Sequence, residues 1–186
     1  MAKLVPESHP ALHAIAEEVP IEEIASARIQ KVLKDMRAVL RSYKAEAFTG
    51  VAIAAPQIGV PLRIFLIEEP RSEHQGDDEN APKLPVLVAI NPRLVSLSKK
   101  KMLMHEGCLS IDDSYGSVLR SIRATLRARD ERGKPYERGA AGLLAQIFQH
   151  ETDHLDGILF LDRAEKIIAK ELVSEKEEKS QEALHL

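Results

Sequence analysis

The segment that most constrains the fold is residues 150–154, with the sequence HETDH. Two histidines four positions apart project to one side of an α-helix, close enough together to hold one metal ion. We therefore expect a helix from about residue 139 to residue 154 that ends near Gly157, because glycine adopts a left-handed cap conformation most readily. One face of this helix carries Leu143, Ile147, His150 and His154. The pattern alone is equally compatible with two hydrogen-bonded core histidines.

Other segments predict a second helix and several strands. Apolar residues recur at helical spacing over residues 24–43, with charged residues between them. Short apolar runs at residues 51–58, 63–68 and 86–90 are typical of strands. Alternating apolar and polar residues over 122–129, followed by the turn sequence DERGKP, predict a hairpin. Strands first and the histidine-bearing helix late indicate an α+β domain.

The composition indicates a soluble cytoplasmic protein. The 186 residues carry a net charge of −3, with both signs spread along the chain, so nothing points to a nucleic-acid surface. No run approaches the roughly 18 apolar residues of a membrane span, and Pro, Glu and His interrupt the N-terminal sequence. We expect one domain over residues 1–165, an exposed loop at 70–85, and a charged, partly helical tail at 166–186.

A third metal ligand is expected, because catalytic sites usually use three protein ligands and leave one position for water. Downstream of the histidines, Glu165 and Glu171 lie in an ordinary charged stretch. The alternative is Cys108 in the segment EGCLS, where a thiolate is a strong ligand for a divalent transition metal. It is the only cysteine of the chain and has no partner for an intramolecular disulfide. A lone cysteine is otherwise most often a small buried apolar residue.

A third segment, residues 50–57, combines small residues with a terminal amide in the sequence GVAIAAPQ. This combination suits a tight pocket wall that carries one hydrogen-bond donor, the Gln57 amide. Taken alone, the segment is more typical of a packed strand and turn.

These three segments, in this order, resemble the three motifs of the peptide deformylase family: a glycine- and alanine-rich strand ending in glutamine, EGCLS, and QHExDHLxG. The third motif reads QHETDHLDG in this chain. The resemblance extends to HPALHAIAEEV near the start and to INP at residues 90–92, so it covers most of residues 1–165. It implies an α+β fold with antiparallel or mixed strands packed around a central metal-binding helix, and a single catalytic domain over residues 1–165.

The resemblance also implies the metal and its ligands. One divalent ion is bound, natively Fe2+, for which Zn2+, Ni2+ or Co2+ can substitute. Its implied ligands are Cys108, His150 and His154.

The implied reaction is hydrolysis of the N-formyl group from the N-terminal formylmethionine of newly synthesised polypeptides, which releases formate. A metal-bound water is the expected nucleophile, since a divalent metal lowers the pKa of its water. Glu151 is the implied general acid and base. The Gln57 amide and the Leu109 backbone N–H are the implied donors to the developing oxyanion.

Three further sets of residues are expected around this chemistry. A formyl carbon bears only hydrogen, so a cramped niche can select it, and the candidate walls are Gly50, Ala52 and Gly107. The apolar pocket for the methionine side chain is expected to include Val51, Met104, Leu143 and Ile147. Metal-bound imidazoles commonly donate their second N–H to a carboxylate or carbonyl, and the candidates for this support are Glu106 and Asp153, with Arg120 paired to either. Val51 and Ala52 would also line the channel where the substrate backbone pairs like an added strand.

The chain departs from the family pattern at two places. Ala52 stands where many deformylases have a second glycine, and Ile111 and Asp112 stand where an apolar residue and proline often follow EGCLS. The methyl group of Ala52 could narrow the channel. Residues 112–116, with the sequence DDSYG, are expected to give the pocket rim an acidic and different shape, so the range of substrates is open.

The expected partners are N-formylmethionyl nascent peptides and, transiently, the ribosome, to which the charged tail could contribute. Two rival functions remain at this point: a metallopeptidase that cuts internal peptide bonds, and a catalytically silent relative that only binds nascent chains. Retention of Glu151 and Gln57 disfavours the silent relative.

Overall fold

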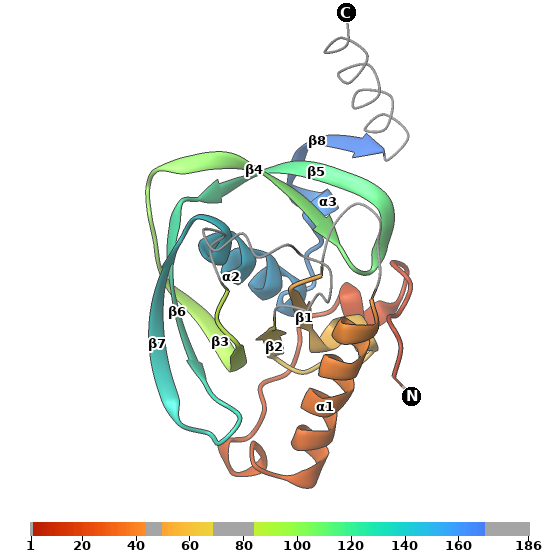
Figure 1. Ribbon diagram of the computed structural model, residues 1–186, viewed down its shortest axis with the longest axis vertical. Helices are drawn as coiled ribbons and strands as arrows, with labels where there is room; N and C mark the ends of the chain where they lie inside the picture. The colour runs from red at the N-terminus through yellow and green to blue at the C-terminus, as the bar shows by residue number, and fades with distance from the viewer. Residues whose placement is uncertain (1, 44–49, 69–83, 170–186) are drawn as a thin grey trace, which may run out of the picture.

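The computed structural model describes residues 2–43, 50–68 and 84–169, which form two antiparallel sheets around one central helix (Figure 1). The first sheet has the order β1-β2-β3-β6-β7, formed by Ala52–Ala54, Ile64–Ile67, Leu87–Leu97, Arg123–Arg129 and Pro135–Ala141. The second has the order β4-β5-β8, formed by Lys101–Cys108, Ile111–Ser121 and Ala164–Ala169. The α-helices are α1 (Ala27–Ser42), α2 (Gly142–Leu155) and α3 (Phe160–Arg163). The expected α+β class is confirmed.

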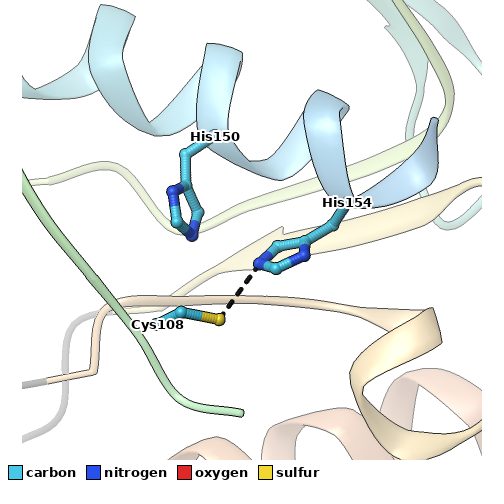
Figure 2. Close-up of side chains that lie close together, drawn as sticks. All are labelled: Cys108, His150 and His154. Carbon is cyan, nitrogen blue, oxygen red and sulfur yellow. Dashed lines mark hydrogen bonds between the residues drawn. The ribbon is translucent and has the colours of Figure 1, made fainter. Parts of the chain in front are cut away.

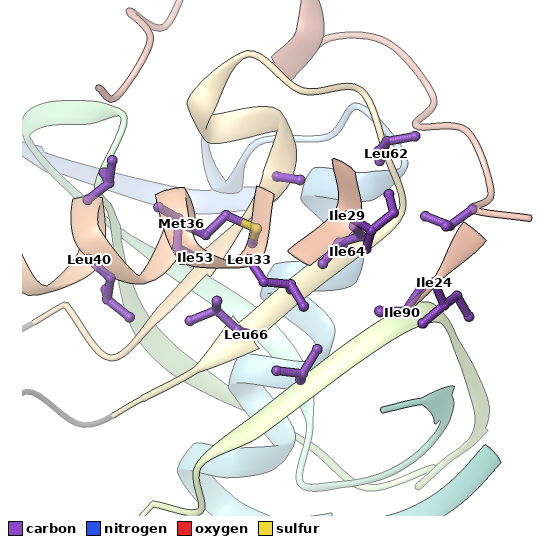
Figure 3. Close-up of a cluster of buried hydrophobic side chains, with 14 of the residues drawn as sticks. Ile24, Ile29, Leu33, Met36, Leu40, Ile53, Leu62, Ile64, Leu66 and Ile90 are labelled. Atoms are coloured by element: carbon purple, nitrogen blue, oxygen red, sulfur yellow. The ribbon is translucent and has the colours of Figure 1, made fainter. Parts of the chain in front are cut away.

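Helix α1 packs against one face of the five-stranded sheet, over β1 and β2 (Figure 3). It begins where the Ser26 hydroxyl accepts a hydrogen bond from the backbone N–H of Ile29 at 3.4 Å, which satisfies one of the free donors of the first turn. Its apolar side packs against every second residue of the strands, such as Ile64 and Leu66. The alternate residues, such as Phe65, point to the opposite face.

Helix α2 covers that opposite face and also contacts β5 of the second sheet, so it lies at the centre of the molecule (Figure 1). Phe148 is completely buried in a cluster with Phe65 from β2. The helix ends as expected before Gly157, which has φ +73°, and a Cβ atom there would lie 2.8 Å from the carbonyl carbon of His13. Glycine is therefore required by both backbone conformation and space.

The expected start of the α2 helix at residue 139 is wrong. Residues Pro135–Ala141 form β7, which pairs along its whole length with β6, and the helix begins only at Gly142. The segment contains good helix formers such as Glu137 and Ala140, but pairing with the neighbouring strand of the hairpin overrides that local propensity.

Several expected strands are confirmed with altered bounds. Of residues 51–58 only Ala52–Ala54 is a strand, and Ala55–Ile58 is a 3-10 helix with Pro56 in its first turn. The strand expected at 86–90 continues to Leu97. Strands β4 and β5 were not predicted, although they carry the cysteine segment between them.

The first residues of the expected tail are not helical, since Ala164–Ala169 forms β8 and pairs with β5. The rest of the tail, residues 170–186, and most of the expected loop, residues 69–83, lie outside the described residues. The division of the chain at residue 165 stays a prediction. Within the described ranges, none of the helices combines the length and the apolar character that a bilayer crossing requires.

Candidate metal centre

Three potential metal ligands converge from two separate parts of the chain (Figure 2). Cys108 ends β4, and the two histidines lie one turn apart on α2. The ligand atoms of Cys108, His150 and His154 all lie within 4.8 Å of one another. The Cys108 Sγ atom is 3.3 Å from Nε2 of His154. The expected convergence of these residues is therefore present.

An irregularity in the pairing of β4 with β5 lies next to the cysteine. The register between β4 and β5 shifts between Glu106 and Cys108, with Gly107 between them. Bulges redirect side chains and are common beside active sites. Here the shift accompanies the placement of a buried thiol, 2% exposed, next to His154.

The donor set fits a divalent transition metal. A thiolate and two imidazoles suit iron, zinc, nickel or cobalt, and three protein ligands leave a position for water or substrate. Burial and the charge of His150 lower the pKa of His154 well below its usual value, which keeps its ring in the neutral form that binds metals. Within the described part of the chain, Nδ1 of His154 and Oε2 of Glu151 are buried without a hydrogen-bond partner.

The Glu106 carboxylate orients the His150 ring. Its Oε2 lies 3.0 Å from Nδ1 of His150. This contact leaves Nε2 of His150 free for a metal. Arg120 donates two hydrogen bonds to the same carboxylate, from Nε at 2.7 Å and from Nη2 at 2.9 Å. Burial alone would raise the pKa of Glu106, but Arg120 and His150 outweigh it and lower the pKa to about 2.

Asp153 lies on the other side of Arg120, which donates to it from Nη1 at 2.6 Å. The structure thus brings together all three residues expected to support the ligands, and Arg120 pairs with both carboxylates rather than with one. Asp153 makes a further ion pair with Arg163, a residue that the sequence did not single out.

Glu151 points into the same region as the ligands. It is 4% exposed and lines a cavity of about 360 Å³ together with His150 and Cys108. Burial raises the pKa of Glu151 to about 7, with a further contribution from the negative charge of Glu106 and an opposing one from His150. A carboxyl group with this pKa exchanges protons readily near neutral pH.

Gln57 presents its amide donor to the site. Its Oε1 accepts a hydrogen bond from the backbone N–H of Ala54 at 2.8 Å, which fixes the direction of the amide. Its Nε2 lies 3.4 Å from Sγ of Cys108 and 3.5 Å from the hydroxyl oxygen of Ser110. Leu109 also lines the cavity.

The cavity includes all but one of the residues expected to contact substrate. Its walls include Gly50, Val51, Ala52, Gly107, Leu143 and Ile147. Gly50 is closely covered, since a Cβ atom there would lie 2.8 Å from Cδ2 of Leu109. Met104, the exception, is buried on β4 and is not among the residues that line this cavity.

The sequence analysis missed two lining residues, His105 and Gln146. Gln146 lies one turn before His150 on α2, and its side chain donates to the carbonyl oxygen of His105 at 2.7 Å. Its position on the helix face toward the cavity could have identified it. Tyr115 also lines the cavity and lies in the segment 112–116 that was expected at the pocket rim, although the strand that carries it was not predicted.

Comparison with known proteins gives one consistent result. The sequence model of the family described as "Polypeptide deformylase" matches residues 1–170. A peptide deformylase of Bartonella quintana (strain Toulouse) is 41% identical over 170 residues, which cover 89% of each chain. Peptide deformylase 1A of Solanum lycopersicum, named as chloroplastic, is 38% identical over 171 residues. These residues cover 88% of this chain but 59% of that relative, and the corresponding Arabidopsis thaliana protein is 61% covered.

Solved structures agree with the sequence relatives. The Met-Ala-Ser-bound structure of class I type b peptide deformylase from Acinetobacter baumannii has a TM-score of 0.75 and 31% identity. The match covers 86% of this chain and 96% of that one. The peptide deformylase of Thermotoga maritima has a TM-score of 0.73 and 27% identity, with 89% and 99% covered. The sequence match, the fold and the converging ligands lead to the same conclusion, that this chain belongs to the polypeptide deformylase family.

Proposed function

We propose that this protein hydrolyses the N-formyl group of the N-terminal formylmethionine of newly made polypeptides and releases formate. Family membership supports this activity. The observation that carries it is the convergence of Cys108, His150 and His154 beside Glu151 on the wall of one cavity. This arrangement combines a metal site with a group that can move protons.

We propose that the ligand set holds one divalent cation, Fe2+ in the native protein. When bound there, the cation supplies Lewis-acid activation of water and of the formyl oxygen at neutral pH. The thiolate donor favours a transition metal over magnesium or calcium. Zn2+, Ni2+ or Co2+ would fit the same donors in purified protein.

Glu151 carries the proton through the reaction. It accepts a proton as the water oxygen attacks the formyl carbon, and it then gives the proton to the amide nitrogen as the C–N bond breaks. The second proton of the water passes from the formic acid to the amine, so the products are formate and a protonated N-terminal amine, and the Glu151 carboxylate returns to its starting state. A pKa of about 7 makes both transfers feasible, because neither the charged nor the neutral form is strongly disfavoured.

Two donors stabilise the charge that grows on the formyl oxygen, the Gln57 side-chain amide and the Leu109 backbone N–H. The hydrogen bond from Ala54 holds the Gln57 amide in place before substrate arrives. A fixed donor of this kind is worth about 3 kcal/mol in the transition state. The small residues Gly50 and Ala52 in the cavity wall favour a formyl group over bulkier acyl groups. Leu143 and Ile147 form the part of the wall that contacts the methionine side chain.

The substrate is made on ribosomes, so we propose that the protein acts in the cytoplasm and contacts ribosomes transiently. Cosedimentation of purified protein with ribosomes at low and high salt tests this contact. Protein that stays in the supernatant under both conditions would contradict it.

One assay separates the proposed activity from its two rivals. Metal-loaded protein is given a formyl-methionyl peptide and, separately, an internally cleavable peptide. Release of formate with an intact chain supports deformylation, chain fragments support a metallopeptidase, and binding without turnover supports a silent relative. Elemental analysis of protein purified without oxygen tests the assignment of iron.

A further inference from the structure

Arg163 ends α3 and reaches the carboxylate of Asp153 on α2. Its Nε lies 2.6 Å from Oδ2 of Asp153, and its Nη2 donates to Oδ1 at 2.8 Å. Two contacts to the two carboxylate oxygens fix the plane of the carboxylate as well as its position. Arg163 is not among the residues that line the cavity.

Asp153 links Arg163 to the metal site. The same Oδ2 atom accepts a hydrogen bond from Nη1 of Arg120. The remaining donors of Arg120 hold both oxygens of Glu106, whose Oε2 contacts Nδ1 of His150. We call this series, Arg163–Asp153–Arg120–Glu106–His150, the charge chain.

The charge chain depends on long-range pairing of strands. Arg120 lies on β5, and Val118 of β5 pairs with Ala164, the first residue of β8. This pairing fixes the end of α3, so that Arg163 and Arg120 approach Asp153 from two different elements. The arrangement closes around a carboxylate that is only 8% exposed.

Arg163 gives Asp153 a cationic partner of its own. Two carboxylates, Asp153 and Glu106, face two guanidinium groups. Without Arg163, one buried guanidinium would serve both carboxylates, and Asp153 would compete with Glu106 for it. Any shift of Arg120 toward Asp153 would loosen its hold on Glu106, and with it the contact that orients the His150 ring.

We propose that Arg163 is a positioning residue for the metal ligand His150, acting through Asp153, Arg120 and Glu106. The proposal rests on the metal site of the proposed function. Arg163 touches neither ligand nor cavity, so its effect must pass along the charge chain. The competing explanation is that Arg163 and Asp153 form an ion pair that contributes only to folding. The Arg163 side chain is 44% exposed, as is common in such pairs.

The test compares Arg163→Met with Arg163→Lys and a matched control. The control is Arg93→Met, which removes an exposed arginine paired with Glu18 at 2.6 Å on β3. Metal-free protein is loaded with Co2+, and three quantities are measured: the Kd by competition with a chelator, the visible absorption spectrum, and the Tm before loading. Disturbing a partner that orients a metal ligand typically weakens metal binding by about 10- to 100-fold.

We expect Arg163→Met to bind Co2+ about tenfold more weakly, at the low end of that range, with a shifted spectrum. Arg163→Lys keeps a positive charge beside Asp153 and should bind Co2+ with most of the wild-type affinity. The control Arg93→Met should bind Co2+ with the wild-type Kd. Because Arg163 acts through Asp153, adding Arg163→Met to Asp153→Asn should cause no further loss of affinity.

A lower Tm for Arg163→Met with an unchanged Kd and spectrum would overturn the proposal and leave a purely structural ion pair. Additive losses in the double variant would overturn it as well. Should Arg163→Met fail to fold, Asp153→Asn still decides the question, since a wild-type Kd and spectrum in that variant would contradict the proposal. Wild-type protein that binds Co2+ but releases no formate would refute the proposed activity, while the Kd comparison would still decide the role of Arg163.

Discussion

The low pKa of Glu106 predicts how the stability of the metal-free protein depends on pH. The folded state holds this pKa at about 2, below the ordinary value of 4.5, because Arg120 and His150 favour the charged carboxylate. Between these values the unfolded chain binds more protons than the folded one. The stabilisation is therefore complete above pH 4.5 and is lost as the pH falls toward 2.

The size of the effect follows from the difference between the two pKa values. At about 1.4 kcal/mol for each pKa unit, the ionised Glu106 contributes about 3 kcal/mol to the free energy of unfolding at pH 7. By pH 3 about 2 kcal/mol of this is lost. The Glu106 side chain is only 2% exposed, so solvent screens this contribution little.

The assay uses Glu106→Gln, which resembles the protonated carboxyl group in shape. Urea unfolding of metal-free wild type and variant is followed by far-UV circular dichroism, because the chain has no tryptophan. The variant should be about 3 kcal/mol less stable at pH 7 and about 1 kcal/mol less stable at pH 3. Glu18→Gln, at an exposed ion pair, should follow the wild-type profile. If the difference in the free energy of unfolding between wild type and Glu106→Gln is the same at pH 7 and at pH 3, the reasoning is refuted.

Four further outcomes are expected. Glu151→Gln should keep its metal by elemental analysis yet lose at least about 100-fold in kcat for formate release, because it cannot move the proton. In the wild type, kcat/KM should fall as the pH decreases through the pKa of Glu151, since Glu151 must be ionised to accept that proton. Burial raises this pKa to about 7 in the metal-free protein, and a bound cation would lower it; a flat profile between pH 4 and 8 would contradict this. Cys108→Ala should lose the metal after dialysis, because only two ligands remain. Gly116→Ala should lower the free energy of unfolding by about 1–3 kcal/mol in urea titrations, since its Cβ would lie 2.9 Å from side-chain atoms of Ala164 and Phe160. Wild-type stability of this variant would contradict the prediction, because it would mean that these two side chains can move aside at no cost.

The parts of the site that the sequence revealed are those encoded over short distances. His150 and His154 are one helical turn apart, so their convergence follows from helix geometry alone. The third donor, Cys108, was found through resemblance to a family, because no local rule brings a residue of β4 to α2. The contact between Cys108 and His154 joins residues 46 positions apart.

The incorrect predictions concern segments whose conformation is set by a partner strand and not by the local sequence. Residues 139–141 have helical propensity, but the β6–β7 hairpin determines their conformation. The tail from residue 166 was expected to be partly helical, but its first residues belong to β8, which completes a sheet with β5. Both segments take their structure from a partner strand, and sequence periodicity carries no information about that partner. Arg163 was missed for a related reason, because its position beside Asp153 depends on the pairing of Ala164 with Val118, which was not predicted.

The buried charges around His150 are better explained by orientation than by stability. Removing one member, as in Glu106→Gln, is costly because it leaves another buried charge without its partner. That cost does not equal the net contribution of the cluster to the stability of the fold. Burying Glu106, Arg120 and Asp153 together requires removing three charges from water, which is itself costly. Apolar residues of similar volume commonly stabilise a fold as well as such a cluster does. An apolar core could not hold Nδ1 of His150 in a fixed direction, and this is the property that a metal site on α2 requires.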